Sequence, residues 1–221
     1  MLGGLFDRSE RDGRQPASGA ASVAPSGPRI TRHSGSWGTL RKRLATEPGL
    51  RVLDVGSTSP TNINYLTSLG NSVYMADLVE EAFTGEWLTG EDEDGKPVWD
   101  ADGFTEQNLQ FSGRTFDIVL LWTTLDYLPE ALLAPVVNAL YASTAPGGQL
   151  LALFHTKLQP ELSPYHRFHV TPADDVELQA AKPAVQLRAL TNRNIERLFA
   201  QWSGLKQFLA KDGVSEAIIT R

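Results

Sequence analysis

The chain has 221 residues and a hydrophobic content of 41%, which suits one globular domain with appendages. It contains no cysteine, so disulfides, thiolate metal sites and cysteine nucleophiles are excluded. The formal net charge is −6 and is unevenly distributed: residues 1–43 carry eight Lys and Arg against three acids, whereas residues 77–106 carry eleven acids and one basic residue, Lys96. Such an acidic body argues against nucleic acid as a partner, because that binding depends on neutralising phosphates.

Residues 1–35 are predicted to form a disordered basic tail, and residues 36–221 the folded domain. Within the tail, residues 7–28 are rich in Arg, Ser, Gly, Ala and Pro without apolar periodicity, so they cannot bury enough surface to offset the entropy of ordering. The arginines could contact an acidic partner or a membrane surface, but a solvated terminus is the more common outcome.

We expect a cytoplasmic protein without an integral membrane segment. The start of the chain reaches the charged Asp7 without the continuous apolar segment of a secretory signal. The longest apolar region, residues 118–142, is interrupted by two acids and two prolines. A lipid-exposed span of about 20 residues would not accept these interruptions.

The folded part begins with a predicted helix at Ser36–Glu47, where apolar residues recur at spacings of three and four. A buried strand is predicted at Leu50–Val55. Ser59 and Pro60 then have the form of a helix N-cap followed by proline at the first helical position. We therefore expect a second helix that runs to Gly70.

Two further strands are predicted at Ser72–Ala76, which is followed by Asp77, and at Phe116–Trp122. The acidic segment between these strands is not assigned to elements. A helix is predicted at Pro129–Thr144, and a buried strand at Gln149–Phe154 follows a Pro-Gly-Gly break.

The C-terminal region begins with an irregular stretch at residues 155–190. Thr191 is predicted to cap a helix that extends to Trp202, and Leu205–Leu209 with Ala217–Thr220 has the pattern of a terminal hairpin. Strands that alternate with helices predict a mainly parallel sheet covered on both faces. The predicted fold class is therefore α/β.

The order of these elements, and the loop that follows the strand at Leu50–Val55, resemble the class I S-adenosylmethionine-dependent methyltransferases, in particular the methyltransferase type 11-like group. The resemblance covers roughly residues 36–221. It implies a Rossmann-like, doubly wound, mainly parallel seven-stranded sheet with a C-terminal antiparallel hairpin. The family carries acid-x-Gly-x-Gly-x-Gly in this loop, where the chain keeps Asp54 and Gly56 but has Thr58 and Pro60 at the other glycine positions.

The resemblance also implies S-adenosylmethionine as the cofactor. Asp77 would accept hydrogen bonds from the ribose hydroxyls, the stretch around Asn108 would contact adenine, and Trp122 would lie beside the transferred methyl group. Other interpretations are a well-capped strand-to-helix turn for the loop, a helix cap for Asp77 and a core side chain for Trp122. The predicted cofactor contacts are Asp54, Gly56, Ser57, Thr58, Asp77, Leu78, Asn108, Leu109 and Trp122.

Asp126, His155 and His166 are the candidates for binding or deprotonating an acceptor. Asp126 and His155 follow strands whose carboxyl ends line the crevice of such sheets, and the family often uses the stretch around His166 as a substrate lid. The alternative for this stretch is a surface loop with aromatic anchors. His166 and His169 are three residues apart without an evident further ligand nearby, so no metal site is predicted.

The function implied by the resemblance is methyl transfer from S-adenosylmethionine to a small-molecule acceptor. The alternative is a catalytically inactive methyltransferase-like domain with an interaction or regulatory role, motivated by the missing glycines. An open cavity between Gly56, Asp77 and Trp122 would favour the enzyme, whereas a space filled by Thr58 and Trp122 would favour the inactive domain. A nicotinamide-dependent oxidoreductase would need Gly-x-Gly-x-x-Gly, which the loop lacks.

Overall fold

The computed structural model describes residues 27–221 apart from residues 58, 160, 162 and 209–211. The predicted disorder of residues 1–26 therefore lies outside the described residues and stays a prediction. Strand β1 (Ile30–His33) forms within the expected tail, and helix α1 (Gly35–Thr46) follows it. The ordered domain thus begins before residue 36, because β1 pairs with a later strand that the sequence analysis did not identify.

A six-stranded sheet in the order β10-β11-β7-β6-β2-β3 forms the centre of the molecule. Four neighbouring strands of this sheet, β7, β6, β2 and β3, are parallel. β11 is antiparallel to β7, and β10 pairs antiparallel with β11, which confirms the α/β class and the terminal hairpin. The strands are β2 (Arg51–Val55), β3 (Ser72–Ala76), β6 (Phe116–Trp122), β7 (Thr144–His155), β10 (Gly204–Phe208) and β11 (Val214–Thr220).

The expected seventh strand is not part of this sheet in the described residues. The acidic segment between β3 and β6 instead forms helix α3 (Leu78–Thr84), a small hairpin of β4 (Leu88–Glu91) and β5 (Pro97–Trp99), and helix α4 (Ala101–Leu109). The segment lacks a continuous apolar run, and aspartates cap both of its helices. Local helix and turn signals therefore prevail over pairing with the edge of the sheet.

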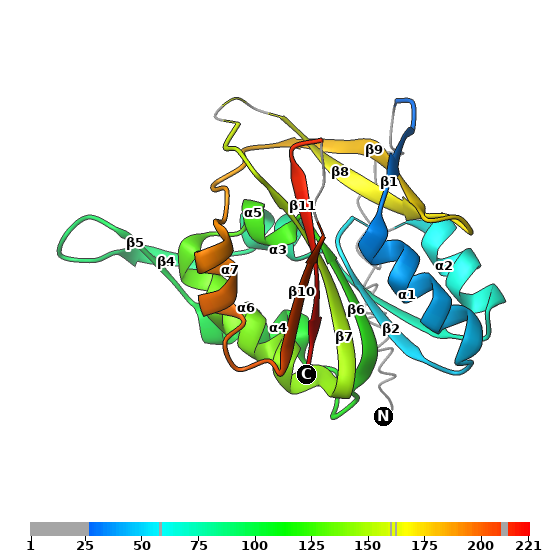
Figure 1. Ribbon diagram of the computed structural model, residues 1–221. Helices are drawn as coiled ribbons and strands as arrows, with labels where there is room; N and C mark the ends of the chain where they lie inside the picture. The colour runs from blue at the N-terminus through cyan, green and yellow to red at the C-terminus, as the bar shows by residue number, and fades with distance from the viewer. Residues whose placement is uncertain (1–26, 58, 160, 162, 209–211) are drawn as a thin grey trace, which may run out of the picture.

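Helices cover both faces of the main sheet (Figure 1). Helices α1 and α2 (Pro60–Ser68) pack on one face, and α4, α6 (Glu130–Ser143) and α7 (Asn192–Leu198) pack on the other. Each face of the sheet has its own cluster of buried apolar residues beneath its helices. The short helix α5 (Thr124–Tyr127) follows β6. The strand-to-helix loops thus gather at the carboxyl ends of the parallel strands, where sheets of this kind bind ligands.

The stretch expected to be irregular contains a second sheet, which corrects that prediction. Strands β8 (Ser163–Val170) and β9 (Asp175–Ala184) form an antiparallel hairpin, and β1 adds to it in the order β1-β9-β8. Its buried residues include Tyr165, Phe168 and Val170. The β8–β9 hairpin lies across one end of the main sheet (Figure 1), so that β8 contacts α2.

Within the described part of the chain, no helix has the length and apolarity needed to cross a membrane.

Candidate functional site

Asp54, the acid of the loop motif, lies near the end of β2 and is buried, with 4% of its surface exposed. Its Oδ1 accepts a hydrogen bond from Trp122 Nε1 at 2.7 Å, and its Oδ2 accepts one from Asn62 Nδ2 at 2.8 Å. Burial raises the pKa of Asp54 to about 6, although both hydrogen bonds favour the charged form. Both carboxylate oxygens are therefore bound within the protein.

The start of α2 has the predicted cap, with an additional function that the sequence did not indicate. Ser59 Oγ accepts a hydrogen bond from the Asn62 backbone N–H, and Pro60 is the first helical residue. The Asn62 amide also donates to the Phe168 carbonyl at 3.0 Å and accepts from the Val170 N–H at 2.7 Å. These hydrogen bonds of Asn62 connect the start of α2 to β8.

A second polar contact joins the same two elements. Ser59 Oγ lies 2.8 Å from His169 Nδ1, and His169 Nε2 lies 3.0 Å from the side-chain oxygen of Gln179. An amide oxygen can only accept, so Nε2 of His169 carries the proton and Nδ1 accepts from the Ser59 hydroxyl. Burial lowers the pKa of His169, which keeps the ring neutral.

The glycine that the loop retains is closely covered. Gly56 is buried, and a Cβ added to it would lie 3.1 Å from Trp122 Cδ1 and 3.6 Å from the Tyr165 hydroxyl. Beside it, Arg167 Nη2 donates to Ser57 Oγ at 3.3 Å. The face of the loop where a ligand would be expected is therefore occupied by side chains from β6 and β8.

The backbone of Trp122 has a strained conformation. Its φ is +49°, in the left-handed region that a bulky side chain rarely adopts. The indole donates to Asp54 and stacks on Phe168, with ring centroids 4.9 Å apart and an interplanar angle of 1°. These two contacts counter the strain and fix the indole against the loop.

Asp77 caps α3, as one of the two interpretations of this residue predicted. Its Oδ1 accepts from the Glu80 N–H at 3.1 Å, and its Oδ2 lies 3.8 Å from Lys182 Nζ on β9. Lys182 also forms an ion pair with the Glu80 carboxylate at 2.9 Å. Burial raises the pKa of Asp77, and the positive charge of Lys182 opposes this effect.

The other expected cofactor contacts do not join this group. Leu78 is fully buried in the core, and the Asn108 amide donates to the Phe104 carbonyl within α4. Leu109 lines a cavity with Thr115, which immediately precedes β6, so it lies at the amino end of that strand. The expected adenine loop includes the end of α4, and the strand that precedes this helix, β5, belongs to the small hairpin and not to the main sheet. Thr58 lies outside the described residues.

The three catalytic candidates do come together at the carboxyl ends of β6 and β7. Asp126 is fully buried, and its Oδ2 accepts from the His155 backbone N–H at 2.7 Å and lies 2.7 Å from His155 Nδ1. Burial raises the pKa of Asp126, while the hydrogen bonds from His155 oppose this effect. These contacts, termed here the Asp126–His155 dyad, fix the orientation of the imidazole. Nε2 is the ring nitrogen that does not contact Asp126.

A cavity of about 280 Å³, termed here the dyad cavity, borders this pair. His155 and His166 line it together with Thr123, Lys157 and Phe168, among others. Burial lowers the pKa of His166, and the nearby His155 adds to the effect. Because Phe168 stacks on Trp122, this aromatic pair lies between the dyad cavity and the loop after β2.

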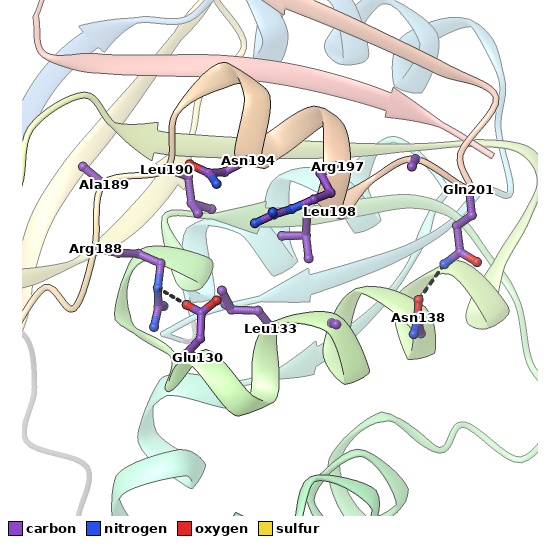
Figure 2. A pocket seen from close by; sticks show the side chains of 12 residues that line it. Glu130, Leu133, Asn138, Arg188, Ala189, Leu190, Asn194, Arg197, Leu198 and Gln201 are labelled. Carbon is purple, nitrogen blue, oxygen red and sulfur yellow. Dashed lines mark hydrogen bonds and ion pairs between the residues drawn. The ribbon is translucent and has the colours of Figure 1, made fainter. Parts of the chain in front are cut away.

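A second cavity lies away from these residues, between α6 and α7 (Figure 2). Its volume is about 590 Å³, and at one end Arg188 forms an ion pair with Glu130 at 3.2 Å. Arg188 also donates to the carbonyls of Leu125 and Leu128, and its backbone N–H donates to the carbonyl of Asp126. Arg188 therefore braces the turn that carries Asp126.

Comparison with known proteins identifies the family. A family described as "Methyltransferase domain" matches residues 30–208, and no curated protein matches. Similar solved structures include a TehB-like SAM-dependent methyltransferase from Corynebacterium glutamicum, with 13% identity, coverage of 84% of this chain and 87% of that one, and a TM-score of 0.49. A 1,6-didemethyltoxoflavin-N1-methyltransferase from Burkholderia thailandensis has 15% identity, coverage of 85% and 77%, and a TM-score of 0.45. The PH0226 protein from Pyrococcus horikoshii has 15% identity, coverage of 82% and 86%, and a TM-score of 0.48. Since the family match spans more than half of the chain, this protein belongs to the methyltransferase domain family.

Proposed function

We propose that this protein transfers a methyl group from S-adenosylmethionine to a small molecule bound in the dyad cavity, with His155 as the general base. The observation that carries the proposal is the Asp126–His155 dyad, which lies at the carboxyl ends of two parallel strands and borders a cavity. Ligands of sheets in this class bind at that edge.

The dyad can accept a proton from a hydroxyl or amine acceptor. Because Asp126 accepts the Nδ1 proton, Nε2 of His155 keeps a lone pair that can take a proton from the acceptor. The buried carboxylate then stabilises the imidazolium that forms. Asp126 acts through His155 and is therefore a positioning residue.

The walls of the cavity favour a small polar acceptor. Lys157 and His166 supply hydrogen-bonding groups, and Phe168 supplies an apolar wall. A cavity of about 280 Å³ suits a compact molecule rather than a polymer chain.

The residues around the loop after β2 suit S-adenosylmethionine in their chemistry but leave no space for it. The donor chemistry is suitable, since Asp77 offers a carboxylate beside the loop and bound S-adenosylmethionine would supply an activated methyl group. The space is not suitable in this conformation, because Tyr165 covers Gly56, Arg167 bonds to Ser57 and Lys182 lies beside Asp77.

The lack of space around the loop favours a second candidate function, a catalytically inactive domain of this family. Both oxygens of Asp54 are bound within the protein, and Trp122 fills part of the space where an open cavity would have favoured the enzyme. An inactive domain would bind neither S-adenosylmethionine nor its demethylated product.

Methyl transfer from labelled S-adenosylmethionine to a panel of small phenols, amines, thiols and carboxylic acids distinguishes the two functions. For an accepted compound, we expect His155→Gln to lower kcat by about 100-fold or more, as the loss of a general base does. The exposed residue His33 offers the matched control His33→Gln, which should leave kcat unchanged. Asp126→Asn should shift the pH profile of kcat as well as lower its value. Absence of transfer to every compound, together with absence of cofactor binding in calorimetry, would contradict the proposal.

A further inference from the structure

We propose that the β8–β9 hairpin, termed here the strap, covers the loop after β2 in the protein without cofactor. Cofactor binding then requires β8 to separate from the start of α2. This inference rests on the proposed function, since it concerns entry of the cofactor to that site.

The strap reaches three of the predicted cofactor contacts, Gly56, Ser57 and Asp77. Tyr165 lies over Gly56, Arg167 donates to Ser57 Oγ at 3.3 Å, and Lys182 Nζ lies 3.8 Å from Asp77 Oδ2. These residues come from both strands of the hairpin. A ligand that touches the loop and Asp77 together must therefore displace side chains of both strands.

Polar groups at the start of α2 hold one side of the strap, and Phe168 of the strap also stacks on Trp122 of the main sheet. Asn62 binds the Phe168 carbonyl and the Val170 N–H, and Ser59 donates to His169. These contacts are a few individual hydrogen bonds, each worth about 1 kcal/mol net. They can be exchanged for ligand contacts without unfolding either sheet.

One donor in the strap, Arg167 Nε, lacks a hydrogen-bond partner among the described residues when the strap covers the loop. This Nε is buried, and burial lowers the pKa of the Arg167 guanidinium. A buried donor without a partner destabilises the conformation that contains it. The closed strap therefore carries a cost that opening would remove.

Calorimetric titration with S-adenosylhomocysteine, combined with hydrogen exchange, tests the strap. The Val170 amide is the reporter, because its partner is the Asn62 side chain. Lys182→Met removes the cation beside Asp77 but retains the apolar stem, and we expect it to lower the Kd about tenfold. Lys206→Met, at an exposed position on β10, is the matched control and should not change the Kd. Binding should also accelerate exchange at Val170.

The outcomes separate the strap from the proposed function. Tighter binding by Lys182→Met with faster Val170 exchange supports the strap. Equal affinities for the wild type and Lys182→Met, with unchanged Val170 exchange in the complex, overturn the strap while leaving the methyltransferase proposal intact. No binding by either protein at millimolar ligand, although both are folded, overturns both.

Discussion

Replacement of Asn62 by alanine offers the sharpest test of how the loop after β2 is held together. Asn62 is 1% exposed, and its side chain bonds to the Asp54 carboxylate, the Phe168 carbonyl and the Val170 N–H. The two bonds to the backbone contribute about 1 kcal/mol each and the bond to the charged Asp54 about 1.5–3 kcal/mol, so the expected loss of unfolding free energy is roughly 3.5–5 kcal/mol.

Urea unfolding at pH 7.5 measures this loss, because Asp54 with a pKa of about 6 is then ionised. Asn64→Ala is the matched control, since Asn64 lies in the same helix but is exposed. Both substitutions gain the same helix propensity, and only the first breaks buried hydrogen bonds. If the two variants unfolded at the same urea concentration, the role assigned to Asn62 would be refuted.

Three further predictions concern residues around the loop. Trp122→Phe should lower the unfolding free energy by about 1.5–3 kcal/mol, because Asp54 loses a donor to its charged form, and should raise the pKa of Asp54 further; urea unfolding at pH 7.5 with an unchanged midpoint would contradict this. Gly56→Ala should lower the thermal midpoint, since the new Cβ would lie 3.1 Å from Trp122, and an equal or higher midpoint would show that the indole moves freely. His169 has a pKa below 6.5 in the folded state, so the unfolded chain takes up its proton first and stability falls as the pH drops below 6.5. His169→Gln should therefore lose less stability than the wild type between pH 6.5 and pH 4.5, and parallel losses in urea titrations would disprove the assignment.

Local signals in the sequence predicted many of the elements. The strands at Ser72–Ala76 and Phe116–Trp122 have the predicted bounds, and Ser59 with Pro60 starts α2 as expected. Each signal is local: an apolar run, an N-cap or a proline at the first helical position. Elements of this kind depend little on distant parts of the chain.

The β8–β9 hairpin shows where local signals were not sufficient. Its burial depends on contacts with the loop after β2, and Arg167 meets Ser57 across 110 residues of sequence. The aromatic residues at Tyr165 and Phe168 were a visible signal of burial, but nothing local indicated which surface they would cover. Asn62 was equally inconspicuous, because an asparagine in the first turn of a helix usually faces solvent.

The candidate site divides in the same way. Asp126 and His155 were placed at one edge of the sheet by the rule that strand carboxyl ends line the crevice, and the structure pairs them beside the dyad cavity. His166, a candidate from the lid that the family resemblance implies, also lines this cavity. The expected adenine contacts Asn108 and Leu109 lie at the end of α4, because the acidic segment contributes no strand to the main sheet within the described residues. A topological rule thus located the residues on paired strands, whereas an analogy across an irregular segment did not.

Within the described residues, β3 is one of the two edge strands of the main sheet and pairs only with β2. Backbone groups along its open side have no partner strand, so we expect this corner of the sheet to open more readily than β2, which is paired on both sides. Asp54 therefore lies on the more rigid strand, while Asp77 follows the less constrained one. The Gly56 N–H connects the loop after β2 to this edge strand, since it donates to the Ala76 carbonyl at 2.9 Å. Because Lys182 lies beside Asp77, the β8–β9 hairpin contacts the site on the side of its less constrained strand.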